Sequence, residues 1–158
     1  MTVHSDLEDA RPPVPVDIAF DQRFDLHGLA ALRLGVSAHG DALGLAEDQL
    51  EDLLIISSEL ATNAVRHGGG SGRLQLWRDG NVVFCRVSDN GPNIIDPAAG
   101  KTLPDPTMIG GRGLWLCRRL SDRLYIESSV QGSTVTAAIV LDDGDCLTPA
   151  RSPAGPSE

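Results

Sequence analysis

Three polar residues at helical spacing are the strongest candidates for chemistry in this 158-residue sequence. Glu59, Asn63 and His67 follow one another at intervals of four, so on a helix they share one face. The amide oxygen of Asn63 is a suitable ligand for Mg²⁺, which takes few protein ligands when phosphate oxygens are also present. Glu59, one turn away, could serve as general base toward a hydroxyl or a water. Taken alone, the pattern also fits the polar end of a solvated helix, and His67 receives no role beyond proximity.

A second candidate segment, Asp89-Asn90-Gly91-Pro92, follows directly on an apolar stretch with strand periodicity. One interpretation is a turn in which Gly91 adopts a positive φ. The other is an acidic acceptor beside backbone that a flat ligand can approach closely. In that case Asp89 would accept a hydrogen bond from an amino group such as that of adenine.

A third candidate is the glycine-rich string Gly110-Gly111-Arg112-Gly113-Leu114, which opens a short helix. Backbone N–H groups at a helix start bind phosphate when no side chain covers them. The chain has a single lysine, Lys101, which does not lie in a P-loop pattern. A polyphosphate would therefore be neutralised by Mg²⁺, by backbone N–H groups and by Arg112. The alternative is a loop that simply leads into a helix.

The elements that must position these residues can be predicted from periodicity. Helical spacing of apolar residues predicts helices, the first capped by Asp25 and ended by Gly40, and alternation predicts two hairpins. A Pro- and Gly-rich connection over 92–110 is typical of a functional lid. Hairpins with helices on one face indicate an α+β fold. The predicted helices are 26–40, 46–68 and 113–123, and the predicted strands are 73–79, 82–89, 124–130 and 133–141.

Charge and composition exclude several classes. The net charge is −9, and the acidic residues concentrate toward both ends of the chain. We expect a flexible acidic tail over 1–15, a folded unit over 16–141 and a disordered tail over 142–158. An acidic chain is a poor binder of nucleic acid or of anionic membranes. The absence of a signal-peptide pattern and of long apolar runs favours a cytoplasmic protein, and the three cysteines show no zinc or disulfide pattern.

The order and spacing of the three candidate segments resemble the GHKL superfamily of ATP-binding domains, which share the Bergerat fold. Residues 57–68 look like its N box, 87–92 like its first glycine box and 110–116 like its second. Residues 131–134 are similar to the Gly-Ser/Thr stretch before the last strand. Within the superfamily, the chain looks most like the small bacterial anti-sigma-factor serine/threonine kinases.

This resemblance implies a two-layer sandwich, with a mixed, mainly antiparallel sheet and helices on one face, and a set of site residues. Glu59 matches the general base, Asn63 the Mg²⁺ ligand and Asp89 the residue that reads adenine. One departure is Asn93, where the first glycine box commonly has a second glycine; Asn tolerates left-handed backbone. The remaining implied nucleotide contacts are Gly91 beside Asp89, Gly111, Arg112, Gly113 and Leu114 at the phosphates, and Thr134 near the adenine.

The function that the resemblance implies is an ATP- and Mg²⁺-dependent serine/threonine protein kinase. It would phosphorylate a STAS-domain antagonist and sequester a sigma factor. The resemblance also implies that the protein forms a homodimer and contacts neither nucleic acid nor membrane. Two alternatives stay open. One is a non-catalytic ATP-binding module that switches partners by contact alone. The other is a stand-alone ATPase domain of the histidine-kinase type, whose acceptor histidine lies on another chain.

Overall fold

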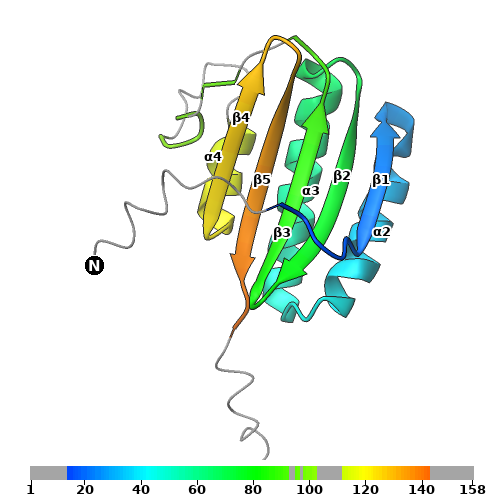
Figure 1. Cartoon of the computed structure of the whole chain (residues 1–158), viewed down its shortest axis with the longest axis vertical. Helices are drawn as coiled ribbons and strands as arrows, with labels where there is room; N and C mark the ends of the chain where they lie inside the picture. Colours follow the sequence, from blue (N-terminus) through cyan, green and yellow to red (C-terminus); the bar gives the residue numbers. More distant parts are fainter. Residues whose placement is uncertain (1–13, 93–94, 97, 103–111, 143–158) are drawn as a thin grey trace, which may run out of the picture.

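Five strands form a single antiparallel sheet in the order β1-β2-β3-β5-β4, and the helices cover one of its faces (Figure 1). The computed structural model describes residues 14–92, 95–96, 98–102 and 112–142. All four pairs of neighbouring strands in this part of the chain are antiparallel, so the expected two-layer α+β fold is confirmed. The strands are β1 (Phe20–Asp25), β2 (Ser71–Asp79), β3 (Val82–Asp89), β4 (Arg123–Ser129) and β5 (Gly132–Val140).

The helical elements are the 3₁₀ turn η1 (Leu26–Gly28), α2 (Leu29–Ala42), α3 (Glu47–His67) and α4 (Arg112–Leu120). Asp25 caps η1 as predicted, because its Oδ1 accepts hydrogen bonds from the backbone N–H groups of His27 and Gly28. The predicted helix end at Gly40 is wrong. Gly40 is buried within α2, where a Cβ would lie 2.8 Å from the Leu50 side chain. Close helix packing therefore accounts for this glycine.

The main core lies between the sheet and the helices, and α3 runs behind its middle strands (Figure 1). Leu53, Ile56 and Leu60 of α3 are fully or almost fully buried. Each such side chain contributes roughly 1.5–3 kcal/mol through removal from water. Cys85 and Cys117 are buried in the same cluster, as expected for small core residues. These apolar contacts fix the position of α3 on the sheet, and with it the polar face that carries the candidate residues.

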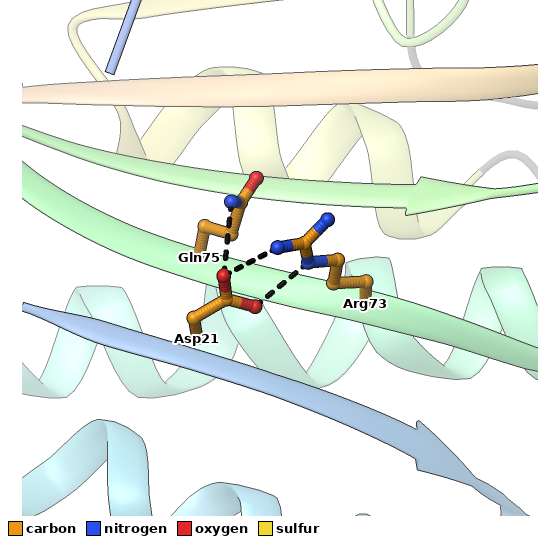
Figure 2. Close-up of polar contacts among 3 residues, drawn as sticks. All are labelled: Asp21, Arg73 and Gln75. Carbon is orange, nitrogen blue, oxygen red and sulfur yellow. Dashed lines mark hydrogen bonds and ion pairs between the residues drawn. The ribbon is translucent and has the colours of Figure 1, made fainter. Parts of the chain in front are cut away.

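Strand β1 is an element that the sequence did not predict. It lies at the edge of the sheet and pairs with β2 from Phe20 opposite Leu76 to Asp25 opposite Ser71. Figure 2 shows a polar contact across this pair: Arg73 donates to the two carboxylate oxygens of Asp21 at 2.7 and 2.6 Å, and Gln75 donates to one of them at 3.3 Å. Cross-strand contacts thus support a strand with few apolar residues.

The sheet face away from the helices carries a second, smaller cluster. Trp77 and Phe84 stack with their ring centroids 5.1 Å apart, and the Arg86 guanidinium lies 5.0 Å from the Trp77 ring centre. These residues alternate along β2 and β3 with those of the main core. None of the helices in the described part of the chain has the length and apolar character of a membrane span.

The predicted domain boundaries are not decided by the structure. The proposed tails, 1–15 and 142–158, lie almost entirely outside the described residues. Both boundaries therefore stay predictions.

Candidate functional site

A cavity of about 370 Å³ opens between α3, the adjoining ends of β3 and β5, and the beginning of α4. This volume lies within the range of small-molecule sites, roughly 300–1,000 Å³. Its walls are mainly apolar, with a small number of polar groups from different elements. The lining residues are Leu60, Asn63, Ala64, His67, Gly68, Val87, Asp89, Ile95, Leu114, Ser133 and Val135.

The polar face of α3 lies against the first turn of α4. Asn63 and His67 line the cavity, and Leu114 of α4 lines it as well. A Cβ built on Gly113 would lie 2.6 Å from Glu59 Oε1 and 3.7 Å from Asn63 Nδ2. The backbone of α4 therefore approaches both side chains closely, which a larger residue at position 113 would prevent. The structure brings Glu59, Asn63, Gly113 and Leu114 together at one end of the site.

Asp89 ends β3 on another side of the cavity, about half-buried. Its Oδ1 accepts a hydrogen bond from the Gly91 N–H at 3.0 Å. Burial raises the pKa of this carboxyl group, while hydrogen bonds from the backbone of Gly91 and Ser133 act in the opposite direction. A carboxylate acceptor beside apolar walls is suited to an amino group carried by a flat ring.

Gly91 does not adopt the positive φ that the turn interpretation of Asp89–Pro92 required. That interpretation is wrong in this detail. A Cβ on Gly91 would instead overlap the backbone of Gly68, at the end of α3. Glycine is needed at position 91 because two backbone segments meet there.

Thr134 does not occupy the position expected of it. Val135 lines the cavity, and so does Ser133, but Thr134 is not among the lining residues. Side chains alternate along a strand, so Thr134 belongs to the other face of the sheet, opposite Ser88 of β3. The polar cavity residue on β5 is Ser133, whose Oγ lies 2.9 Å from Ser128 Oγ. Counting back in steps of two from the apolar residues of β5 would have identified it.

Two side chains attach the connection after β3 to the rest of the fold. The Ile95 N–H donates to Ser128 Oγ at 2.8 Å, and Arg118 Nε donates to the Ala99 carbonyl oxygen at 2.7 Å. Ile95 lines the cavity, so the first contact sets one wall of the site. Sequence reasoning missed both contacts, because the partners are 33 and 19 residues apart.

Part of the predicted phosphate-binding string cannot be placed. Gly111, like Asn93, lies outside the described residues, and the 92–110 connection is described only in part. Arg112 begins α4 and is exposed, one residue before the Gly113 backbone that faces Glu59. The assignments of Gly111 and Arg112 to phosphates therefore stay predictions.

Comparison with known proteins identifies the family. Residues 23–139 match the sequence model described as "Histidine kinase-like ATPase domain". The chain belongs to this family. The matched region covers every described helix and the five strands, except for the first half of β1 and the last residue of β5.

Curated relatives of this ATPase-type domain include serine-protein kinases. The chain is 31% identical to serine-protein kinase RsbW of Bacillus velezensis over 123 residues, which is 68% of this chain and 74% of that protein. It is 30% identical to RsbW of Bacillus subtilis, with the same coverage. In a solved structure of the RsbU and RsbW domains of a Mycobacterium tuberculosis protein, the match has a TM-score of 0.57 at 19% identity. It covers 83% of this chain but 33% of that one, and it shows likeness of fold.

Proposed function

We propose that this chain is an ATP-dependent serine/threonine protein kinase that acts as an anti-sigma factor. It transfers the γ-phosphate of ATP to a STAS-domain antagonist, and it sequesters a sigma factor while that antagonist is phosphorylated. The observation that carries the proposal is the meeting of Glu59 and Asn63 with the first turn of α4, beside a cavity that also presents Asp89. Relatives named serine-protein kinase support the choice of acceptor.

The cavity residues fit an adenine nucleotide with its cation. Asp89 accepts from the amino group of the base, and the apolar walls formed by residues such as Val87 and Val135 suit a flat ring. Asn63 would supply an oxygen ligand to Mg²⁺, and the bound cation would offset phosphate charge. In the described part of the chain no three His, Cys, Asp or Glu side chains gather as a cation site, so phosphate oxygens would complete the ligand set. Gly111, Arg112 and Gly113 would face the phosphates.

Glu59 would act as the general base. Its carboxylate takes the proton of the acceptor hydroxyl as that oxygen forms a bond to the γ-phosphorus, while the bond to the ADP oxygen breaks. Positioning and charge stabilisation dominate phosphoryl transfer, so one base on a rigid helix is sufficient protein machinery. We also propose that the protein acts in the cytoplasm and that two copies of the chain form a homodimer.

The experiment that tests the function compares Glu59→Gln with the wild type. We expect transfer to a STAS-domain protein to fall about 10²–10⁴-fold, because general-base catalysis has roughly that worth. Calorimetry should show ADP affinity within about twofold of wild type, since Glu59 is not among the residues that line the cavity. Glu51→Gln is the matched control: it is exposed on the same helix, two turns earlier, and should transfer phosphate normally.

Two further results would decide between the alternatives. Label on a partner histidine instead of serine or threonine would replace the proposal with the histidine-kinase type. Tight ATP binding without transfer to any STAS-domain protein would favour a module that switches partners by contact.

Asn63→Ala should remove the Mg²⁺ dependence of nucleotide binding; retained dependence would exclude Asn63 as the ligand.

A further inference from the structure

Three glycines enclose Asp89. A Cβ built on Gly68 would overlap the Asp89 carboxylate, one on Gly132 would overlap its backbone oxygen, and one on Gly91 would overlap Gly68. Atoms cannot share such space, so side chains at these positions require Asp89 or its surroundings to move. The three glycines come from the end of α3, the loop after β3 and the start of β5. They meet because of the fold and not because of their spacing in the sequence.

Gly68 has no backbone reason to be glycine. Its φ of −107° and ψ of 26° are open to other residues, and its N–H closes α3 on the Ala64 carbonyl oxygen at 2.8 Å. The two glycines that follow differ, because Gly69 and Gly70 have φ values of 95° and 94°. A side chain at position 68 would come closest to the Asp89 carboxylate and would enter the space that this carboxylate occupies.

The carboxylate is therefore held on two sides. The Gly91 N–H donates to Oδ1 at 3.0 Å, and the bare Cα of Gly68 lies against Cγ and Oδ2. A methyl group at position 68 would push the carboxylate away from this place and break or bend its bond to Gly91. An acceptor that has moved no longer meets the amino group of the base in the geometry that a hydrogen bond needs.

We propose that Gly68 is a positioning residue for base selection: its missing side chain places the Asp89 carboxylate where it distinguishes adenine from guanine. This inference rests on the proposed nucleotide site and gives a role to a glycine in the wall of that cavity. Adenine offers an amino group to the carboxylate, whereas guanine presents a carbonyl oxygen at the corresponding position, which repels it. Correct placement of one acceptor thus separates the two bases.

A double-mutant cycle tests the proposal. Affinities for Mg-ADP and Mg-GDP are measured by calorimetry for wild type, Gly68→Ala, Asp89→Ala and the double variant. We expect Gly68→Ala to weaken ADP binding about tenfold or more, the worth of a charge-assisted hydrogen bond, and to lower the preference for ADP over GDP. In the Asp89→Ala background, Gly68→Ala should change ADP affinity by less than about twofold, because Gly68 acts through Asp89.

The cycle also separates a competing cause. A Cβ on Gly68 would approach the Ala64 carbonyl oxygen, at 2.8 Å, as well as Asp89. If that contact decides, the loss on Gly68→Ala persists in the Asp89→Ala background, and the proposal is overturned. The matched control is Gly70→Ala, whose Cβ meets nothing within 4 Å although its φ is positive. It should lose stability and keep the ADP preference.

If Gly68→Ala folds poorly, the free energies of unfolding of the same four proteins still test the proposal. The double variant removes the carboxylate that the methyl group would strike, so its free energy of unfolding should return close to that of Asp89→Ala. A double variant as unstable as Gly68→Ala would refute the role of Asp89. A Gly68→Ala protein with the wild-type preference for ADP over GDP would refute the role of Gly68 and leave the kinase proposal intact. A wild-type protein that binds no adenine nucleotide would refute both proposals.

Discussion

Replacing Asp89 with asparagine should weaken nucleotide binding while making the free protein more stable. The two effects have different causes. The first is the loss of a charged acceptor for the amino group of the base. The second is the relief of a carboxylate whose pKa is raised, first of all by burial. Opposite signs in one conservative variant are the mark of a residue placed for binding at the expense of folding.

The size of the binding effect follows from the contacts of Asp89. Oδ1 accepts from the Gly91 N–H, which an asparagine oxygen can still do. The other position then becomes an NH₂ group, a donor facing the amino group of the base. Turning the amide over moves the clash to Gly91, so one donor always lacks an acceptor. Losing a hydrogen bond to a charged group costs about 1.5–3 kcal/mol, so we expect ADP affinity to fall roughly 10–150-fold.

The sign of the stability effect depends on pH. The folded state raises the pKa of Asp89 above its ordinary value of 3.8, so the folded state holds the proton more tightly. Stability that comes from the protonated form is present below that ordinary value and is lost as pH rises through the folded pKa. Asp89→Asn should therefore be more stable than wild type at neutral pH, with a difference that vanishes in acid. The gain will be small, because the partly exposed carboxylate keeps part of its hydration.

Calorimetry with Mg-ADP and urea unfolding at several pH values measure both effects. Thr136→Ser is a suitable control, because Thr136 is buried on the other face of the sheet and lies outside the cavity. It should leave ADP affinity unchanged. An Asp89→Asn protein that binds ADP normally and unfolds more easily at neutral pH would refute the reasoning, since Asp89 would then serve the fold alone.

Two further predictions concern β5 and β1. Ser133→Ala should lower ADP affinity about 2–12-fold, because a typical hydrogen bond contributes about that much to binding. Thr134→Ala should leave ADP affinity within about twofold of wild type. Calorimetry distinguishes the two variants, and the reverse result would restore Thr134 to the site. Asp21→Asn should lower the free energy of unfolding at neutral pH, because hydrogen bonds from Arg73 lower the pKa of Asp21 below 3.8 and stabilise its ionised form. That difference should be fully present above pH 3.8 and lost as pH falls through the lowered pKa, so a difference that is constant with pH in urea unfolding would contradict it.

Elements with a strong local pattern were predictable from the sequence. The Gly80-Asn81 turn lies between β2 and β3 as expected, with Gly80 at a φ of 64°. Helix α3 begins at Glu47 and ends at His67, one residue inside the predicted range of 46–68 at each end. Both depend on periodicity and on turn or helix-end residues, which act over short distances in the chain.

Strand β1 was not predictable in the same way. Its sequence, FDQRFD, has two apolar residues, and Phe24 is its single buried one. Its support comes from pairing with β2 and from the contact of Asp21 with Arg73, 52 residues away. A strand that depends on partners so distant in the sequence leaves little local signal.

The site shows the same division. The shared face of Glu59, Asn63 and His67 followed from helical spacing alone, and the structure places these residues beside the cavity or lining it. The choice of Thr134 followed a motif, and strand alternation contradicts it. Gly68, first of a run of three glycines, looked like an ordinary helix end. Its contact with Asp89, 21 positions later, depends on how α3 meets β3, which no local pattern contains.

The end of the site at Asp89 and the end at Glu59 are supported by different elements of the fold. We therefore expect substitutions at the two ends to affect nucleotide binding and phosphate transfer separately. Asp89 and Ser133 lie on adjacent strands in register with each other, so their separation is fixed by the sheet. Glu59 faces α4, whose own support includes the contact of Arg118 with Ala99. Substitutions at the sheet end should therefore raise KM for ATP with little change in kcat, because they alter a contact made equally before and during transfer. Removing the carboxylate of Glu59, which faces α4, should lower kcat and leave ADP affinity alone. A Glu59→Gln protein that lost affinity and rate together would mean that the two ends form one cooperative unit, and that α4 positions the base as well as the phosphates.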